Sequence, residues 1–480
     1  MKANIHNLGV VKNAVIDIKP LTVLIGPNNS GKTWLAYTLS AILGRYGWSR
    51  YLKAYVEGSV ADHYPLLEQA VEQIVNQGNA TVDTVEFVAT YSERYVNNVA
   101  NLAKEWMPEY MSTSRVSFAE LDVHILLGEG VEKLKSHALA YTYTRRLSVG
   151  RQRDKPLLTA EKEAGKPDLY IYTSSSEDVI ENLPSKAVKE VIAEGVFQLF
   201  HEALFSDTPT FPTERTTFIT FPLRLVRAGD LESRRILRAG TLESRRTLDV
   251  DDDRPSKLIG PVGAFLDMVV ATFAVTQEAQ KEREEEASND RRIAAYINAS
   301  VVLEQQILEG DVKFSTLDFA RSRDLLFRPA EGVTLDISLA SSMVKELTAL
   351  VLYLRYLAEP DDWLIIDEPE MNLHPEAQVK LTELLAMLVQ AGLRVFITTH
   401  SPYIVDHLAN LLKAAKAPDK EAIRDKFFLK QVNSFLSKED VSVYEVNKGE
   451  IRPILDDDDI IDWKTFSSIS DRVMQIYFEL

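Results

Sequence analysis

The stretch TVLIGPNNSGKT, residues 22–33, decides the fold of this chain. It fits the pattern G-x-x-x-x-G-K-[ST], with Gly26, Gly31, Lys32 and Thr33 at the fixed positions. Glycine at 26 and 31 permits backbone angles and close approaches that a side chain would block. Backbone N–H groups of the loop, and the N-terminus of the following helix, then face phosphate charge. The stretch therefore predicts a P-loop between a strand and a helix.

The expected ligands of this loop are the phosphates of a nucleotide and Mg²⁺. Lys32 is expected to reach the β- and γ-phosphates, and the Thr33 hydroxyl to bind Mg²⁺. The residues expected to bind the nucleotide are Gly26, Pro27, Asn28, Asn29, Ser30, Gly31, Lys32, Thr33 and Trp34. P-loops serve kinases, GTPases, ring-forming motors and clamps that close around two nucleotides, so the loop alone leaves the use of the energy open.

A pair of acids follows a second apolar strand. In DDWLIIDEPEMNLHP, residues 361–375, the strand 363–366 ends in Asp367 and Glu368. Parallel strands deliver such residues to a ligand crevice. One acid there can hold Mg²⁺ through water, and a second can align or deprotonate the attacking water. We assign the metal role to Asp367 and the catalytic role to Glu368.

A histidine ends a third apolar strand, in LRVFITTHSP at residues 393–402. A helix and turn at 375–392 separate this strand from the acids, which predicts a right-handed βαβ unit with His400 beside them. Its imidazole is expected to contact the γ-phosphate or the water. His374, in the turn after the acids, has either a loop role near a second nucleotide or a structural one. The other histidines are expected to be structural or at the surface: His6, His63, His124, His137, His201 and His407.

A fourth element, ISLASSMVKEL at residues 337–347, precedes the acid strand. Two serines open a helix whose apolar stripe comprises Val344, Leu347, Val351 and Leu354. Serine at a helix start is commonly only an N-cap, so this element is weak by itself. Together with the other three elements, it narrows the choice among P-loop proteins.

The order of these elements resembles that of the ATP-binding-cassette ATPases, in the soluble branch with RecF, the structural-maintenance-of-chromosomes (SMC) proteins and the overcoming-lysogenisation-defect (OLD) family. GPNNSGKT, DEPEMNLHP and TTHSP are close to the OLD-like form, and the resemblance covers about residues 1–45 and 205–480. It implies two heads that sandwich two ATP molecules, where a serine of one subunit contacts the γ-phosphate held by the other. On this resemblance Ser341 is the signature serine, followed by Lys345, and Glu368 is the catalytic glutamate. Lys32 and His400 complete the expected catalytic set.

The sequence departs from that family's pattern at two places. Met343 stands where the family usually has glycine, which bears on how tightly the heads close and hence on turnover. No glutamine for a Q-loop occurs in residues 207–225, where PTER occupies the region. Glu214 and Arg215 are therefore either nucleotide-sensing residues or surface structure.

The fold class expected is α/β, a P-loop ATPase head built from both chain ends with a largely α-helical insertion. The expected segments are 1–45 with the P-loop; 46–204, the helical insertion; 205–315, a β return at 210–225, a repeat and a helical subdomain; and 316–480, the second part of the head.

Composition excludes several classes of protein. The 480-residue chain has no cysteine, which excludes disulfides, zinc fingers and thiol catalysis. It has no run of 18 apolar residues and no signal peptide, so we expect a cytoplasmic protein without a membrane segment. The net charge of −17 repels nucleic acid on average, so any DNA contact requires a local basic patch.

Such a patch is offered by the tandem repeat RAGDLESRRIL and RAGTLESRRTL at residues 227–248. Its 11-residue period is close to three helical turns. With Arg224, the segment 224–246 holds seven arginines, and it is either a basic patch for DNA, RNA or an acidic partner, or a solvated insertion. Only 80 residues follow His400, which is short for the C-terminal Toprim nuclease that OLD nucleases carry. The run Asp456–Asp459 either imitates the metal-binding acids of such a nuclease or is a solvated turn. VNKGE at 446–450 ends in glutamate, which argues against the guanine-reading motif and GTP.

Three functions remain open. The first is an ATPase, homodimeric or in a higher homo-oligomer, that regulates a separate effector such as a Toprim-like or HNH nuclease or a toxin. In this it resembles the stand-alone ATPases of anti-phage defence, such as those of the PARIS and Septu systems. The second is a RecF-like DNA-repair clamp, and the third is a scaffold that binds ATP but hardly hydrolyses it.

Overall fold

The computed structural model describes most of the chain. The described residues are 1–128, 130–147, 156–173, 184–220, 258–315, 324–456, 460–462, 472 and 474–479. Two compact units make up the chain, and each is described separately. Unit 1 comprises Met1–Leu8, Thr38–Pro108 and Arg115–Thr208, and unit 2 comprises Gly9–Tyr37, Glu109–Ser114 and Pro209–Leu480.

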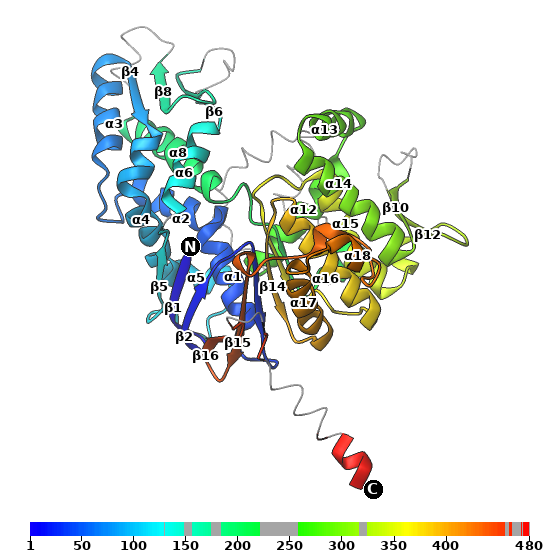
Figure 1. Ribbon diagram of the computed structural model, residues 1–480. Coiled ribbons are helices and arrows are strands. Elements are labelled where there is room, and N and C mark those ends of the chain that lie inside the picture. The colour runs from blue at the N-terminus through cyan, green and yellow to red at the C-terminus, as the bar shows by residue number, and fades with distance from the viewer. Residues whose placement is uncertain are drawn as a thin grey trace. The chain divides into compact units, whose positions relative to one another are not determined.

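Unit 2 is built on a largely parallel sheet, which confirms the expected α/β class (Figure 1). Its strands, in spatial order, are β2 (Val11–Asp17), β16 (Glu450–Pro453), β15 (Val441–Asn447), β3 (Leu21–Ile25), β14 (Arg394–Thr399), β13 (Trp363–Asp367) and β9 (Thr210–Phe211). From β15 to β9 every pairing is parallel. All residues of β3 and β13 are buried, as expected for central strands covered on both faces.

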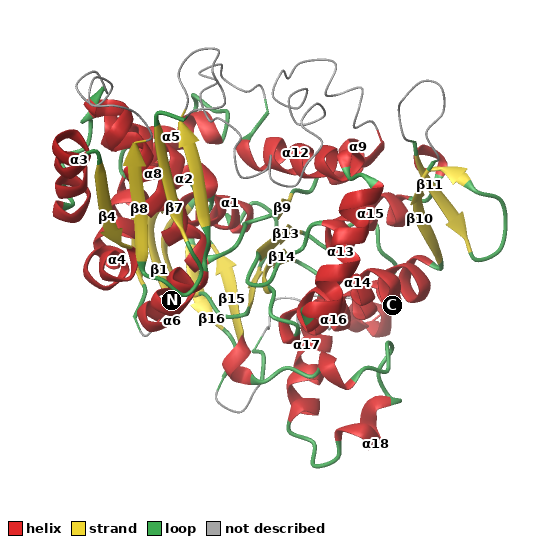
Figure 2. Ribbon diagram, turned by 90° about the horizontal axis from the view of Figure 1, so that it is seen from above, coloured by secondary structure: helices red, strands yellow, loops and turns green. Residues whose placement is uncertain are grey.

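The register of this sheet brings three strand ends to one edge. Asp367, the last residue of β13, pairs with Thr398 of β14, and Thr399 pairs with Ile25 of β3. The P-loop begins directly after Ile25, and His400 directly after Thr399. The βαβ unit predicted from the sequence is therefore present, with β13 and β14 parallel and adjacent (Figure 2).

Helices pack around this sheet. They are α9 (Arg215–Thr220), α12 (Gly260–Ala274), α13 (Gln277–Asn289), α14 (Arg291–Val302), a π-helix (Leu303–Leu308), α15 (Ser342–Tyr356), α16 (Pro375–Gln390), α17 (Pro402–Ala415) and α18 (Lys420–Arg424). A small antiparallel sheet contains β10 (Gly310–Phe314), β11 (Leu325–Pro329) and β12 (Leu335–Asp336). α1 (Lys32–Leu43) follows the P-loop, as predicted.

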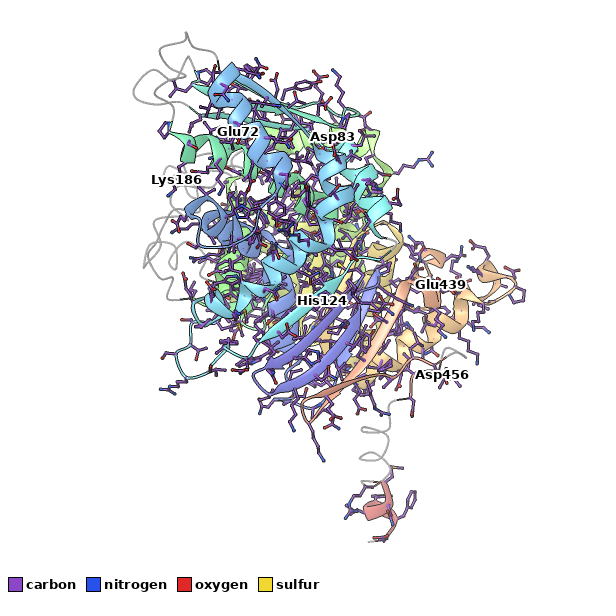
Figure 3. All side chains as sticks on the ribbon, turned by 90° about the vertical axis from the view of Figure 1, so that its left-hand side faces the viewer. Glu72, Asp83, His124, Lys186, Glu439 and Asp456 are labelled. Carbon is purple, nitrogen blue, oxygen red and sulfur yellow. The ribbon has the colours of Figure 1, made fainter. Side chains whose placement is uncertain are left out.

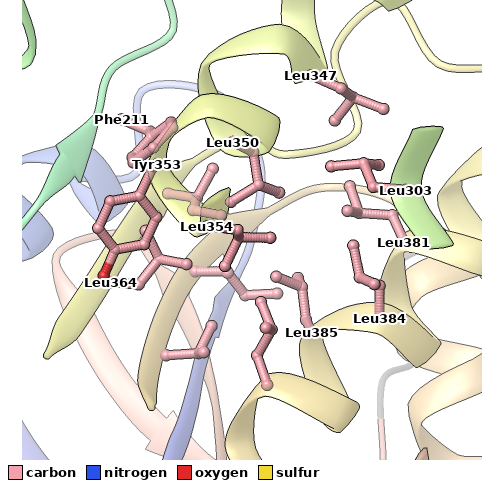
Figure 4. Packing of buried hydrophobic residues seen from close by; sticks show 14 of the residues in the cluster. Phe211, Leu303, Leu347, Leu350, Tyr353, Leu354, Leu364, Leu381, Leu384 and Leu385 are labelled. Atoms are coloured by element: carbon pink, nitrogen blue, oxygen red, sulfur yellow. The ribbon is translucent and has the colours of Figure 1, made fainter. Parts of the chain in front are cut away.

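The core of unit 2 lies between α15 and its neighbours (Figure 4). The predicted apolar stripe of α15 is buried in full: Val344, Leu347, Val351 and Leu354. Leu381 and Leu385 of α16 belong to the same cluster. Burying one such side chain contributes about 1.5–3 kcal/mol, so this packing fixes where α15 begins relative to the sheet.

The expected β return at 210–225 is wrong for most of its described part. Only Thr210–Phe211 is a strand, and Arg215–Thr220 forms α9. β-branched residues in TTFIT favour a strand, but this preference depends on context. Here Phe218 lies with its ring centroid 6.2 Å from that of Phe265 on α12, and tertiary packing outweighs the local preference. The repeat at 227–248, the arginine patch at 224–246 and Asp457–Asp459 lie outside the described residues.

Unit 1 is rich in helices but also contains an antiparallel sheet that the sequence analysis did not anticipate (Figure 1). The sheet has the order β4 (Asn79–Asp83), β8 (Asp168–Thr173), β7 (Leu158–Lys162) and β6 (Tyr143–Leu147). Strand β1 (Lys2–Leu8) pairs with β5 (Asp122–Leu126) in antiparallel orientation. The main helices are α2 (Arg45–Glu57), α3 (Pro65–Gln77), α4 (Thr84–Asn101), α5 (Ala103–Tyr110, which spans the unit boundary), α6 (Gly130–Ala140) and α8 (Ser185–Leu204). The four segments expected from the sequence remain predictions, and residues 1–8 group with unit 1.

His124 and Asp456, two residues noted in the sequence, make contacts away from the edge at which the strands end. His124 lies on β5 and its Nδ1 contacts Asn97 Oδ1 at 2.6 Å, a structural role (Figure 3). Asp456 accepts a hydrogen bond from the N–H of Ile460 at 2.8 Å. Among the described residues, no single helix has the length and apolarity to cross a membrane, and only the pair α12 and α13, bent by 99°, meets that test jointly.

Candidate functional site

The P-loop is packed so tightly that its two fixed glycines have no room for a side chain. A Cβ on Gly26 would lie 2.2 Å from the carbonyl oxygen of Val446, in β15. A Cβ on Gly31 would lie 2.4 Å from Val11, in β2, and Gly31 also has a φ of 103°, which favours glycine. The neighbouring strands thus hold the loop in a curved shape that any larger residue would disrupt.

Lys32 is 4% exposed and curls over the loop that carries it. Its Nζ donates hydrogen bonds to the carbonyl oxygens of Gly26 at 2.9 Å and Pro27 at 3.0 Å. Burial lowers the pKa of Lys32, and the carboxylates of Glu368 and Asp367 oppose that shift. A buried ammonium with only neutral carbonyls as ligands is suited to exchange them for phosphate oxygens.

The remaining P-loop residues differ in exposure. Pro27, Asn28 and Asn29 are exposed, whereas the Ser30 hydroxyl is buried without a hydrogen-bond partner. Trp34 packs on the turn before β2, because a Cβ on Gly9 would lie 2.5 Å from its ring. The exposed residues can meet a ligand directly, and Trp34 supports the loop from its side.

Asp367 is buried and surrounded by hydroxyl groups. Its carboxylate accepts hydrogen bonds from Thr33 Oγ1 at 3.0 and 3.1 Å, from the Tyr37 hydroxyl at 3.4 Å, and from Thr398 Oγ1. Burial raises the pKa of Asp367, and the hydrogen bonds from Thr398 and Thr33 lower it. Sequence reasoning missed Tyr37 and Thr398. Tyr37 lies one helical turn after Thr33, so the i, i+4 spacing was the available signal.

Thr33 and Asp367 together fit Mg²⁺ in a nucleotide site. Mg²⁺ takes oxygen ligands and is usually held by one or two carboxylates together with substrate phosphates and water. In the described part of the chain, no group of three or more histidine, cysteine or acidic side chains has metal-binding geometry. One hydroxyl and one carboxylate therefore suit a metal that arrives with a nucleotide.

Glu368 and His400 form an ion pair at the same edge. His400 Nδ1 lies 3.4 Å from an oxygen of Glu368 and 3.4 Å from an oxygen of Glu370. The contact with the Glu368 carboxylate raises the pKa of His400, and the same contact lowers the pKa of Glu368. The imidazole thus lies between two carboxylates that favour its protonated form, and Glu368 can act on water once the imidazole engages another anion.

Glu370 was not singled out from the sequence, although it lies in the same DEPE segment. Its Oε1 accepts hydrogen bonds from Thr399 Oγ1 and from the backbone N–H of His400, both at 2.8 Å. These bonds attach the loop after β13 to the end of β14. Glu370 therefore positions the backbone from which the imidazole of His400 extends.

Arg215 is buried, so the surface interpretation of this residue is wrong. Its guanidinium donates hydrogen bonds to the carbonyl oxygens of Asp367 at 2.7 Å and Glu368 at 2.8 Å, and it pairs with Glu346 of α15. Glu214 beside it is exposed. The nucleotide-sensing interpretation of these two residues remains a prediction.

Ser341 does not join this group within the described chain. Its side chain caps α15 by accepting a hydrogen bond from the N–H of Val344 at 3.3 Å, and it has no hydrogen bond to the P-loop or the acids. Met343 is half-buried and packs against the core. His374 caps α16 from an exposed loop position. Lys32, Thr33, Asp367, Glu368 and His400 thus come together, and Ser341 is left for another role.

Comparison with known proteins agrees with a nucleotide site. A family described as "AAA domain, putative AbiEii toxin, Type IV TA system" matches residues 251–406, a span with Ser341, the acid pair and His400 that begins after the P-loop. No curated protein matches the chain. The family match supports an ATPase of the AAA type, and it covers less than half of the chain.

Similar solved structures include three SMC heads, each 10% identical over 94% of this chain. One is the SmcHead bound to the C-winged helix domain of ScpA, with a TM-score of 0.36 and 96% of that chain covered. Another is the Smc head with an extended coiled coil bound to the C-terminal domain of ScpA from Pyrococcus furiosus, at 0.35 and 95%. The third is the SMC head domain from Thermotoga maritima, at 0.30 and 98%. These TM-scores are too low to support a functional conclusion.

Proposed function

We propose that the chain is a Mg²⁺-dependent ATPase whose hydrolysis acts as a switch for a partner protein. The observation that carries the proposal is the convergence at one sheet edge of a buried lysine, a hydroxyl–carboxylate pair and a glutamate–histidine pair. These are the parts that phosphoryl transfer to water requires: a phosphate cradle, metal ligands and a group that orients water.

The roles follow from the contacts. Lys32 would leave the carbonyl oxygens of Gly26 and Pro27 for the phosphates, and Thr33 and Asp367 would hold Mg²⁺. Bound Mg²⁺ neutralises charge on the phosphates. His400 would turn from Glu368 toward the γ-phosphate, which frees the Glu368 carboxylate to orient and deprotonate water.

A second copy of the chain is the proposed source of a further contact. Ser341 opens α15 at an exposed position, and within the described part of the chain its side chain has no hydrogen bond to its own P-loop. The N-terminus of a helix favours anions. We propose that two heads sandwich two nucleotides, with Ser341 of each copy facing the γ-phosphate held by the other, in a homodimer or a higher homo-oligomer.

The partner is proposed to be a separate effector, a nuclease of the Toprim-like or HNH type or a toxin, in a cytoplasmic anti-phage system. The matched family's description names a toxin of a toxin–antitoxin system, which favours this class over others. The RecF-like DNA clamp stays an alternative from the sequence, because its arginines at 224–246 lie outside the described residues. Co-purification with the product of a neighbouring gene, with and without ATP, tests the effector proposal, and a partner-free chain with salt-dependent DNA binding would contradict it.

The hydrolysis proposal is tested by the substitution Glu368→Gln. Glutamine keeps the size of the side chain but cannot accept the proton from water. We expect kcat to fall at least about 100-fold while the affinity for ATP changes less than about threefold, as for loss of a catalytic base. Phosphate release and fluorescent-ATP titration measure the two quantities. The assignment of Glu368 would be wrong if the variant hydrolysed ATP at the wild-type rate.

A further inference from the structure

We propose that Arg215 is a positioning residue that holds Glu368 in place and links it, through Glu346, to the helix that Ser341 opens. Engagement of Ser341 by a nucleotide on a second copy would then change the position of Glu368 in its own site. The inference rests on the proposed ATPase function. It assigns the regulation of that site to a residue whose guanidinium binds the backbone carbonyls of Asp367 and Glu368.

Glu368 needs external support because its backbone is strained. Its φ is 48°, in the left-handed region that a residue with a side chain rarely adopts, and Pro369 follows it. Such a conformation costs on the order of 1–3 kcal/mol and persists only where surrounding contacts enforce it. Pro369 has no N–H with which to anchor the chain.

Arg215 supplies this support on both sides of Glu368. Its Nη1 donates a hydrogen bond to the carbonyl oxygen of Asp367, in the peptide group before Glu368. Its Nη2 donates one to the carbonyl oxygen of Glu368, in the peptide group after that residue. The N–H of Glu368 is held from the other side by the carbonyl oxygen of Thr398 at 3.0 Å. Both peptide groups that flank Glu368 are therefore fixed, and the guanidinium fixes the two carbonyls.

The guanidinium of Arg215 also reaches α15, the helix that Ser341 caps. Arg215 pairs with Glu346, which lies on α15 five residues after Ser341. Both side chains are buried, at 2% and 1% exposure. Burial lowers the pKa of Arg215 and raises that of Glu346, because it disfavours the charged form of each side chain. The attraction between the two charges opposes both shifts. In some proteins, buried ion pairs of this kind are retained because they fix a specific geometry.

Glu346 also contacts the loop that follows the acid strand. Its second oxygen accepts a hydrogen bond from Asn372 Nδ2 at 3.3 Å. Asn372 has a φ of 59°, in the left-handed region that asparagine adopts more readily than most residues. Three segments thus meet at Glu346: α15, the first residue of α9, and the loop that carries Glu368. A small shift of α15 would move all three, because buried contacts do not deform continuously.

The test compares Arg215→Lys with a matched buried arginine. Lysine keeps the charge for Glu346 but lacks the planar fork that holds two carbonyls at once. Arg283→Lys is the control, because Arg283 is 4% exposed and donates to the carbonyl oxygen of Ala358 and to Glu359, outside the site. We expect both variants to lose similar stability, while only Arg215→Lys loses at least about tenfold in kcat with its affinity for ATP unchanged.

A double-mutant cycle tests the proposed link between Arg215 and Ser341 at the start of α15. If Arg215 transmits engagement of Ser341, then Ser341→Ala and Arg215→Lys act on one pathway, and the double variant should have a kcat close to that of the slower single variant. Multiplicative losses in the double variant would overturn the link. Equal kcat values for Arg215→Lys and Arg283→Lys would overturn the positioning role.

Glu346→Gln provides a second variant in case Arg215→Lys does not fold. It keeps the shape of the side chain and removes its charge, and we expect the same loss in kcat without a loss in affinity for ATP. A wild-type kcat in Glu346→Gln would also overturn the proposal. If the wild-type chain itself does not hydrolyse ATP with Mg²⁺, the proposed function fails and this inference fails with it. If the wild type hydrolyses ATP and Glu346→Gln does so with the same kcat, only the inference fails.

Discussion

At the scale of single residues, the site depends on a few buried polar groups whose partners are close in space and far apart in sequence. Asp367 takes hydroxyl contacts from Thr33, Tyr37 and Thr398, which come from two different elements. Lys32, by contrast, donates hydrogen bonds to two carbonyl oxygens of its own loop, those of Gly26 and Pro27. A phosphate or a metal can replace each of these contacts with little further desolvation cost, because burial has already removed water from these groups.

The His400–Glu368 pair makes a prediction about stability and pH in the protein without nucleotide and Mg²⁺. The pKa of His400 is raised, so its contribution is complete below its ordinary value of 6.5 and is lost as the pH rises through the folded pKa. The pKa of Glu368 is lowered, so its contribution is complete above 4.5 and is lost as the pH falls through the folded pKa. The pair therefore stabilises the fold most between these values.

We expect the stability difference between wild type and His400→Gln to be larger at about pH 5.5 than at about pH 8.5. Urea unfolding at the two pH values measures it. Glu368→Gln removes the other partner and should show the same dependence relative to wild type. A difference between wild type and His400→Gln that is equal at the two pH values would contradict the pairing.

At the scale of elements, the position of α15 is decided by its apolar face. Leu354 is fully buried in the core that α15 shares with α16. We expect Leu354→Ala to lower the free energy of unfolding by about 2–5 kcal/mol, because the substitution leaves a cavity in close packing. Leu339, which is 70% exposed just before the helix, is the control, and Leu339→Ala should change stability by less than about 0.5 kcal/mol. Chemical denaturation measures both, and equal effects would show that α15 is not anchored by this face.

At the scale of the whole molecule, the proposed two-headed arrangement predicts an association that depends on nucleotide. We expect Glu368→Gln, which binds ATP without turnover, to associate into dimers or larger assemblies when ATP and Mg²⁺ are added. Ser341→Arg in the same background should block this association, because a bulky side chain would occupy the place of the phosphate contact. Analytical ultracentrifugation measures the molar mass. A monomer under all conditions would contradict the two-headed arrangement.

The sequence by itself determined the α/β class, the P-loop, the strand ends at Asp367, Glu368 and His400, and the helix that Ser341 opens. These features depend on local patterns of glycine, apolar runs and caps, which a single chain displays directly. Register then follows, since parallel strands place their ends at one edge.

Only the tertiary structure decided which further residues serve that edge. The contacts of Tyr37, Arg215, Glu346 and Glu370 depend on partners from other elements, and segment TTFIT is helical against its own β preference. The antiparallel sheet of unit 1 was missed because its strands are short and interrupted by long helices. The physical reason is the same in each case: burial and partner geometry come from contacts distant in sequence, and no local pattern reports them.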